Sequence, residues 1–225
     1  MKKLKVIALG LCAALVVGCS TKTGTGALIG TGGGALVGGI IGKIAGNTAV
    51  GAAVGAAVGA GTGALIGRHM DKVKEETEAQ LENAKVEEVT DANGLKAVKV
   101  TFDSGILFAL NKADLNATSK NELARFSNVL KNNSNCSVDI QGYTDSTGND
   151  GINIPLSQQR AESVSNYLKS CGVSASQIEK VQGYGSANPV ADNSTAAGQA
   201  QNRRVEVYLY ASQEMIDAAN NGTLQ

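Results

Sequence analysis

The sequence predicts a two-layer α/β sandwich of about 125 residues that follows a glycine-rich helical hairpin. Two observations support this prediction. From about residue 104 onward, apolar runs with the two-residue period of strands alternate with segments of helical period. Earlier in the chain, residues 24–67 hold 16 of the 28 glycines and a single charged residue, Lys43. The length of 225 residues suits one domain with accessory segments.

Residues 1–18 have the pattern of a secretory signal. A lysine-rich start precedes an apolar run that is too short to span a bilayer comfortably. The segment ends in Leu-Val-Val-Gly-Cys-Ser at residues 15–20, which resembles a bacterial lipobox in which Cys19 is acylated and becomes the mature N-terminus. An ordinary cleaved signal with a chance cysteine is the alternative. By the sorting rule of such lipoproteins, Ser20 implies the outer membrane.

Glycine recurs at every fourth position within residues 24–67, a period that flexible linkers lack. Because residues 47–50 interrupt it, we expect a helical hairpin with arms of 21 and 17 residues. Small residues on one helical stripe let a partner backbone approach closely. Three interpretations stay open: a hairpin in or on the membrane, a zipper that makes homo-oligomers, and a glycine-rich spacer. The periodic glycines are Gly26, Gly30, Gly34, Gly38, Gly42, Gly46, Gly51, Gly55, Gly59, Gly63 and Gly67.

Two polar segments border the expected domain. Residues 68–84 have a charged helical pattern, which predicts a solvated helical connector. Within it, His69 is expected to be a surface residue rather than a ligand. At the other end, residues 213–225 are expected to form a polar tail with a short helix near residues 214–219.

Residues 85–212 are expected to form the α/β domain. It should begin with a β-hairpin, because Asn93-Gly94 lies between the alternating segments 85–89 and 95–102. Asn-Gly is the dipeptide best suited to a tight hairpin turn.

The remaining elements follow from apolar periodicity and capping residues. For the second helix of the domain, Ser157 is the expected N-cap and Gly172 the expected terminator. The expected elements are a helix over 118–131, a strand over 137–142, a helix over 157–170, a strand near 181–184 and a strand over 205–210.

The composition argues against nucleic-acid binding and against catalysis. Without Lys2, Lys3 and Lys5 of the signal, 17 basic and 20 acidic side chains remain, and no basic stripe is present. The α/β region contains no histidine, no Gly-x-Ser-x-Gly elbow and no cysteine pair with metal-ligand spacing. We therefore expect a binding protein and not an enzyme, with no metal and no cofactor.

Two cysteines remain after Cys12 of the signal and the anchor Cys19 are set aside. Cys136 precedes a strand, and Cys171 ends the helix that follows this strand. These two ends return to the same edge of a sheet, so a disulfide is geometrically reasonable in an oxidising compartment. Two independent thiols are the alternative.

A carboxylate and a guanidinium stand out in the domain. Asp145 follows the strand-like run 138–141, and Arg160 would lie in the first turn of a helix capped by Ser157. A helix N-terminus disfavours a cation and attracts anions, so both would converge on a ligand carboxylate. Together with Asp145, this favours a zwitterionic ligand. The alternative is that Arg160 pairs with Asp145 or with a carboxylate in a neighbouring loop.

Several spaced motifs resemble one known family over roughly residues 95–210. They are Phe-Ala-Leu-Asn-Lys-Ala-Asp-Leu at 108–115, Gly-Tyr-Thr-Asp at 142–145, Leu-Ser-Gln-Gln-Arg-Ala at 156–161, Gly-Tyr-Gly at 183–185 and Asn-Arg-Arg-Val-Glu at 202–206. Their order is that of the OmpA C-terminal-like domain, which peptidoglycan-associated lipoproteins and flagellar stator proteins share. With the glycine zipper and lipobox, the chain resembles OmpA-family lipoproteins of the YiaD type.

The resemblance implies a two-layer sandwich of the OmpA C-terminal-like type that binds peptidoglycan non-covalently through the diaminopimelate of the peptide stem. Asp145 would take the diaminopimelate ammonium, Arg160 its carboxylate, and Asn111 would contact the peptide. The chain would tether the outer membrane to the cell wall, with its domain in the periplasm. Alternatively, the zipper carries a membrane-active or oligomerising function and the domain is only an anchor.

Further site residues follow from the same resemblance. Thr144 and Asn153 would shape the pocket, and one of the paired arginines Arg203 and Arg204 would be structural. Many relatives have His where Tyr143 stands, and Ile152 replaces a Tyr that relatives often carry before Asn153.

Overall fold

The computed structural model describes residues 60–91, 93–108 and 112–224. The predicted signal, Cys19, nearly all of the glycine-rich hairpin and Asn111 lie outside the described residues.

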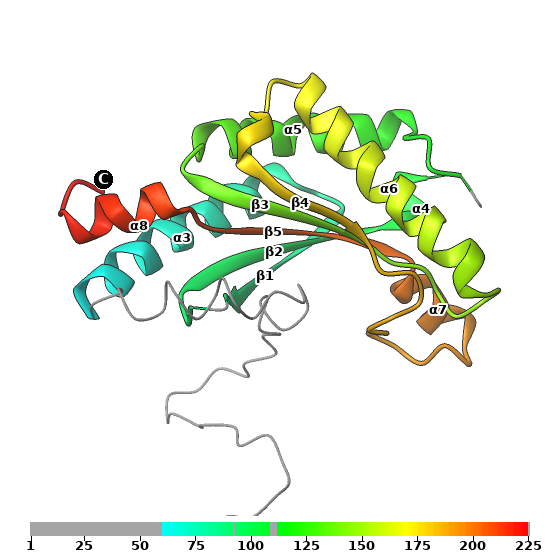
Figure 1. The fold of residues 1–225 in the computed structure, drawn as a ribbon. Helices are drawn as coiled ribbons and strands as arrows, with labels where there is room; N and C mark the ends of the chain where they lie inside the picture. The colour runs from blue at the N-terminus through cyan, green and yellow to red at the C-terminus, as the bar shows by residue number, and fades with distance from the viewer. Residues whose placement is uncertain (1–59, 92, 109–111, 225) are drawn as a thin grey trace, which may run out of the picture. The chain divides into compact units, whose positions relative to one another are not determined.

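A five-stranded mixed sheet forms the centre of the domain (Figure 1), with the strand order β1-β2-β5-β3-β4. The pairs β1–β2, β2–β5 and β5–β3 are antiparallel, and β3–β4 is parallel. The strands are β1 (Ala84–Thr90), β2 (Lys96–Asp103), β3 (Cys136–Gly142), β4 (Ile178–Gly183) and β5 (Arg204–Ala211).

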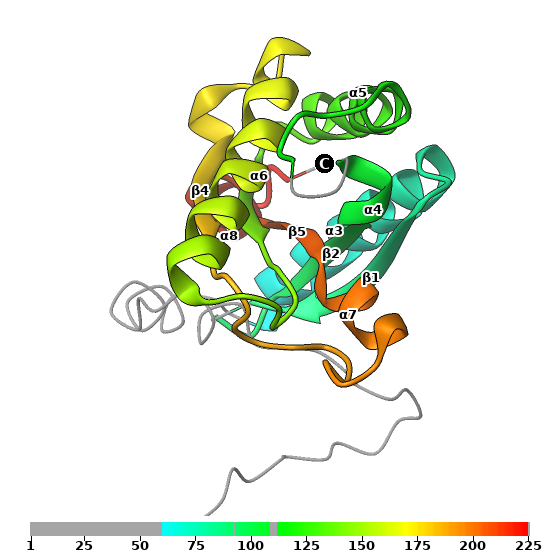
Figure 2. The ribbon, with the colours of Figure 1, turned by 90° about the vertical axis from the view of Figure 1, so that its right-hand side faces the viewer.

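Helices cover one face of this sheet (Figure 2), and their apolar side chains share one core with the strands. Phe102 of β2 and Phe126 of α5 meet edge to face in this core, with ring centroids 5.7 Å apart. The two-layer α/β sandwich predicted from the sequence is therefore confirmed. The helices are α3 (Ala60–Gln80), α4 (Ser104–Leu107), α5 (Ala117–Asn132), α6 (Asp150–Ser170), α7 (Ala196–Asn202) and α8 (Gln213–Asn220), with a 3₁₀ turn at Ala175–Gln177.

Most helix and strand boundaries lie close to the predicted positions, and turn or capping residues account for them. The β1–β2 turn contains Gly94 with a φ of 77°, a left-handed conformation that glycine adopts without strain. The Asn116 side chain accepts a hydrogen bond from the Ser119 N–H and caps α5. Gly172, with a φ of 94°, follows the end of α6 as predicted.

The predicted start of α6 is wrong. The helix begins at Asp150, about two turns before Ser157, and Pro155 lies inside it. Proline removes one backbone hydrogen bond from a helix, and α6 continues through this loss. Ser157 does not cap the helix, because its hydroxyl accepts a hydrogen bond from the Gly185 N–H at 2.9 Å. It therefore joins α6 to the loop after β4.

The prediction of a solvated connector over residues 68–84 is also wrong. Residues 68–80 are helical as expected, but α3 packs against β2, α5 and α8. Ile66, Met70 and Val73 are fully buried. Their spacing of four and three residues places them on one face of the helix. The helix thus belongs to the core of the domain.

The segment after residue 212 is part of the same core rather than a polar tail. Met215, Ile216 and Ala219 of α8 are buried. The Thr62 hydroxyl of α3 donates a hydrogen bond of 2.7 Å to the Asn220 amide oxygen. The predicted short helix is confirmed, and the two ends of the described chain pack together.

The possible disulfide between Cys136 and Cys171 is not present in the structure, where both residues are free thiols. Cys136 is 1% exposed in the core, where its sulfur lies 3.9 Å from the Met70 sulfur. Cys171 is partly exposed at the C-terminal end of α6. The first sulfur therefore packs against α3, a helix that the sequence prediction placed outside the core.

Candidate ligand-binding site

A polar cavity of about 320 Å³ lies between the loop after β3, the first half of α6, and α7. The structure thus brings Asp145 and Arg160 together, as the sequence predicts. The lining residues are Thr144, Asp145, Thr147, Ile152, Asn153, Leu156, Arg160, Gln199 and Arg203.

Asp145 forms its ion pair with Arg203. Nη1 of Arg203 lies 2.6 Å from Oδ2 of Asp145, while Oδ1 accepts a hydrogen bond of 2.8 Å from the Thr147 N–H. Burial alone would raise the pKa of Asp145, but the bonds from Arg203 and Thr147 outweigh it and lower the pKa. The carboxylate is therefore ionised near neutral pH.

Arg160 is a buried cation that forms no ion pair with any carboxylate of the described residues. It is 4% exposed, and its Nε donates a hydrogen bond of 3.1 Å to the Lys112 carbonyl. Its guanidinium also lies 5.2 Å from the centre of the Phe108 ring. Burial lowers the pKa of Arg160, Arg203 lowers it further, and Asp145 opposes both.

The expected first-turn position of Arg160 and the alternative that Arg160 pairs with Asp145 are therefore both wrong. It lies in the third turn of α6, because the helix begins at Asp150, so the dipole argument for a first-turn cation does not apply. It also does not pair with Asp145. Instead, the cavity holds two guanidinium groups and one carboxylate. This excess positive charge, with Arg160 desolvated, suits a ligand carboxylate.

Thr144 and Asn153 have different parts in the cavity. The Thr144 hydroxyl is buried and has no hydrogen-bond partner among the described residues, so it can bond to a ligand. Asn153 is 4% exposed, and its amide donates a hydrogen bond of 3.0 Å to the Thr147 carbonyl. Asn153 therefore holds the loop that carries Asp145.

Arg204 and Tyr143 lie outside the cavity. The Arg204 guanidinium is 3.9 Å from the centre of the Tyr143 ring, and its Nε bonds to Glu206 at 2.7 Å. Tyr143 is fully buried, donates to the Gln141 amide oxygen and stacks on Tyr184. Of the two neighbouring arginines, Arg203 lines the cavity, whereas Arg204 contacts Glu206 and Tyr143 outside it.

Two glycines let α6 approach the strand ends closely. A Cβ on Gly142 would overlap the Ser157 carbonyl, and a Cβ on Gly183 would overlap the backbone of Gln158. The Gly183 N–H donates a hydrogen bond of 2.6 Å to the Gln158 side chain. This close contact fixes the helix that carries Arg160 relative to the loop that carries Asp145.

Sequence reasoning missed four lining residues: Thr147, Ile152, Leu156 and Gln199. Ile152 and Leu156 precede Arg160 by eight and four residues, so they share one face of α6. That spacing is present in the sequence, but it was missed because the predicted helix started at residue 157, after both Ile152 and Leu156. Gln199 likewise precedes Arg203 by four residues, in a helix that was not predicted.

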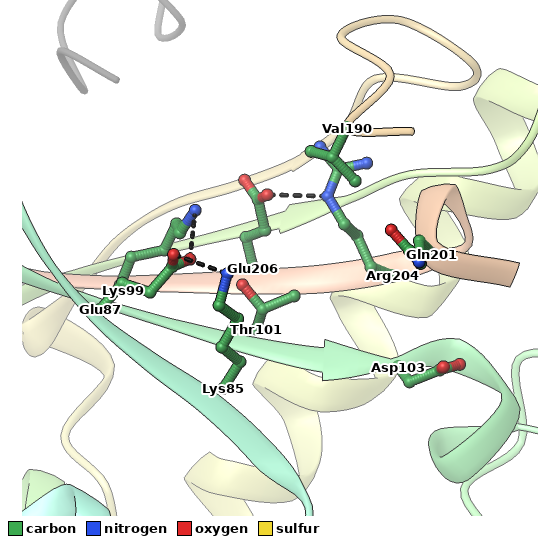
Figure 3. Close-up of a pocket in the computed structure, with 9 residues that line it drawn as sticks. All are labelled: Lys85, Glu87, Lys99, Thr101, Asp103, Val190, Gln201, Arg204 and Glu206. Carbon is green, nitrogen blue, oxygen red and sulfur yellow. Dashed lines mark hydrogen bonds and ion pairs between the residues drawn. The ribbon is translucent and has the colours of Figure 1, made fainter. Parts of the chain in front are cut away.

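A second cavity, of about 380 Å³, lies on the sheet face opposite α5 and α6, with Gln201 of α7 among its lining residues (Figure 3). Its charged groups largely neutralise one another. Glu87 pairs with both Lys85 and Lys99, and Glu206 pairs with Arg204. This cavity therefore lacks the excess charge of the first one.

Among the residues that the structure describes, no helix is long and apolar enough to cross a membrane. No group of three or more His, Cys, Asp or Glu side chains there could hold a metal ion.

Comparison with known proteins gives two family matches. Residues 107–203, which include the cavity, match the model of the OmpA family. The chain carries an OmpA-family domain. Residues 1–71 match the model of the YMGG-like Gly-zipper. The predicted combination of a glycine zipper and an OmpA-type domain is confirmed.

Three relatives each align with about half of the chain. The probable lipoprotein YiaD of Escherichia coli K12 is 50% identical over 110 residues, 49% of this chain and 47% of YiaD. The peptidoglycan-binding protein ArfA of Mycobacterium tuberculosis is 44% identical over 113 residues, 50% of this chain and 34% of ArfA. The outer-membrane lipoprotein YfiB of Pseudomonas aeruginosa is 41% identical over 110 residues, 49% of this chain and 65% of YfiB.

The chain therefore spans about a third to two thirds of the length of these relatives. YiaD is named as a probable lipoprotein and YfiB as an outer-membrane lipoprotein. Among solved structures, a MotB-like protein from Desulfovibrio vulgaris matches with a TM-score of 0.55 at 20% identity. The match covers 67% of this chain and 96% of that one, and it shows the fold alone.

Proposed function

We propose that the chain binds peptidoglycan non-covalently through the free end of diaminopimelate in the peptide stem. The observation that supports this most directly is the cavity with Asp145 ionised and Arg160 buried without a carboxylate partner. The free end of diaminopimelate carries both an ammonium and a carboxylate. Its carboxylate would bond to Arg160, and its ammonium would bond to Asp145 beside the unpaired Thr144 hydroxyl.

The Asp145 carboxylate can accept the ammonium of a zwitterion beside the ligand carboxylate at Arg160. Asp145 accepts hydrogen bonds from Arg203 and from Thr147, and an ionised carboxylate has about four lone-pair sites. An ammonium can therefore be added without displacing Arg203. The lipobox at Cys19 would provide the other attachment, a lipid in the outer membrane. The chain would then tether the outer membrane to the cell wall, which is the role we propose.

Peptidoglycan sacculi provide the test. The detergent-solubilised full chain should sediment with purified sacculi, and free diaminopimelate should compete with it. Arg160→Ala should weaken this binding by about 2–5 kcal/mol, since it removes one partner of a buried charge pair. Asp145→Ala should have an effect of similar size.

Surface variants of the same residue types serve as controls. Arg125 and Asp217 are exposed and lie in α5 and α8, away from the cavity. Arg125→Ala and Asp217→Ala should bind sacculi as the native chain does. If Arg160→Ala and Asp145→Ala fold and also bind normally, this cavity is not the site.

A second candidate function rests on the YMGG-like Gly-zipper match over residues 1–71. Here the zipper would assemble copies of the chain or act on the membrane, and the OmpA-family domain would serve only as an anchor. The two candidate functions predict different effects of mutation. Changes in the cavity should abolish the function of a peptidoglycan tether, whereas changes in the zipper should abolish assembly or action on the membrane.

A further inference from the structure

One wall of the ligand-binding cavity is apolar and leads away from Arg160. Ile152, Leu156 and Arg160 follow one another at intervals of four residues along α6, and all three line the cavity. Residues at this spacing lie on one face of a helix. The wall therefore runs from a buried cation, past a partly buried leucine, to an exposed isoleucine.

The exposure of Ile152 is unusual within the domain. It is 59% exposed, although most large apolar side chains that the structure describes are buried. Two others, Ile154 and Val190, are also exposed, but neither lines this cavity. Ile152 adds little to the core, so its apolar surface is available to a ligand.

The length of the wall indicates what would reach it. Ile152 and Arg160 are eight residues apart, which is about 12 Å along a helix axis. An extended chain advances about 3.5 Å for every three backbone bonds, so about ten bonds cover this distance. Counted from a carboxylate at Arg160, ten bonds pass the far end of a diaminopimelate and reach the next residue of the stem.

We propose that Ile152 binds the small aliphatic side chain, such as the methyl group of alanine, of the stem residue next to diaminopimelate. Leu156 packs against the methylene chain between the two ends. This inference rests on the proposed function and extends it, because the cavity then recognises a dipeptide unit rather than a single diamino acid. A free diaminopimelate would fill only the part of the cavity near Arg160.

Two dipeptides test the inference by isothermal titration calorimetry with the full chain. One joins diaminopimelate to alanine through its backbone carboxyl, and the other replaces the alanine with glycine. The native chain should bind the alanine dipeptide about fourfold more tightly, because one methyl group is removed from water. Ile152→Ser should abolish this preference.

Val190→Ser is the matched control, since Val190 is 55% exposed and lies in the second cavity. It should keep the preference for alanine. Equal affinities of the native chain for both dipeptides, or a preference retained in Ile152→Ser, would overturn the inference. If the native chain still bound sacculi and Arg160→Ala weakened this binding, the proposed function would remain intact. If the native chain did not bind sacculi, both the proposed function and this inference would be overturned.

Discussion

Arg203, 58 residues after Asp145 in the chain, forms the ion pair that keeps the Asp145 carboxylate in place. The two atoms of the pair lie 2.6 Å apart, at one end of the sheet, where the loop after β3 approaches the start of β5. Arg160 is left as the buried cation of the cavity. Arg203 therefore holds Asp145 ionised, whereas Arg160 remains available to a ligand.

Arg203→Ala should move the acid limit of peptidoglycan binding to higher pH. The pKa of Asp145 is lowered in the native chain, so its ionised form contributes stability that is lost only as pH falls through that low value. Without Arg203, burial would raise the pKa, and protonation would begin at higher pH. Sacculus sedimentation between about pH 3 and pH 7 measures the pH at which half of the binding is lost, with Arg125→Ala as control. An unchanged midpoint would show that Asp145 is not the titrating group.

Met70→Ala should destabilise the whole domain. Met70 is fully buried in α3, and removing a large apolar side chain from a core costs about 2–5 kcal/mol. Lys72→Ala, at an exposed position of the same helix, should change stability by less than about 0.5 kcal/mol. Urea unfolding of the full chain followed by circular dichroism compares them. Equal stabilities would mean that α3 does not pack in the core.

Gly183→Ala should impair both folding and ligand binding. Its new Cβ would overlap the backbone of Gln158, so α6 would have to move away from the strand ends and take Arg160 with it. Gly67→Ala is the control, because nothing lies within 4 Å of its Cβ and alanine favours helix by about 1 kcal/mol. Thermal unfolding and sacculus binding should separate these variants. A Gly183→Ala chain with native values of both would contradict the close packing of α6.

Cys136 should resist alkylation, whereas Cys171 should react. Burial raises the pKa of the Cys136 thiol to about 12, so almost no thiolate is present near neutral pH. Cys171 is partly exposed at the end of α6. Maleimide treatment of the folded chain, followed by mass mapping, should label Cys171 and leave Cys136 unlabelled, whereas denatured chain should be labelled at both of these residues. Protection of both thiols in the folded chain would indicate a bond between them.

Replacing Gly34 and Gly55 with leucine tests the zipper without touching the cavity. Both glycines belong to the four-residue period, and bulky side chains would prevent close helix contact. If the zipper assembles the chain, cross-linking should show loss of oligomers while sacculus binding persists. Unchanged oligomers would mean that the zipper is only a spacer.

The sequence predicted those elements of the fold that strong local signals determine. The Asn93-Gly94 turn, the apolar face of α5 and the apolar run of β5 each depend on a few neighbouring residues, and the structure confirms the hairpin, the helix and the strand that they predict. The start of α6 was missed because Pro155 lies in its second turn and Ser157 resembles a cap. In the structure, the Ser157 hydroxyl instead bonds to the Gly185 N–H, a partner 28 residues away.

The cavity was predicted in part for a similar reason. Motif positions identified Asp145 and Arg160, and the structure places both in one cavity. Which arginine pairs with Asp145 depends on how the loop after β3 meets the start of β5, and no local pattern reports this. The buried face of α3 was visible as Ile66, Met70 and Val73, but the charges between them favoured a solvated helix.

Helix α3 also limits how the parts of this chain can be exchanged. The YMGG-like Gly-zipper match ends at residue 71, in the middle of α3, whereas the OmpA-family match begins only at residue 107. A chimera cut at either boundary would divide the helix or discard it. Grafting this domain onto another anchor would therefore require residues 60–224 as one piece, because Thr62 bonds to Asn220 at the far end of the chain. The segment that must be transferred as one piece is therefore longer than the OmpA-family match over residues 107–203.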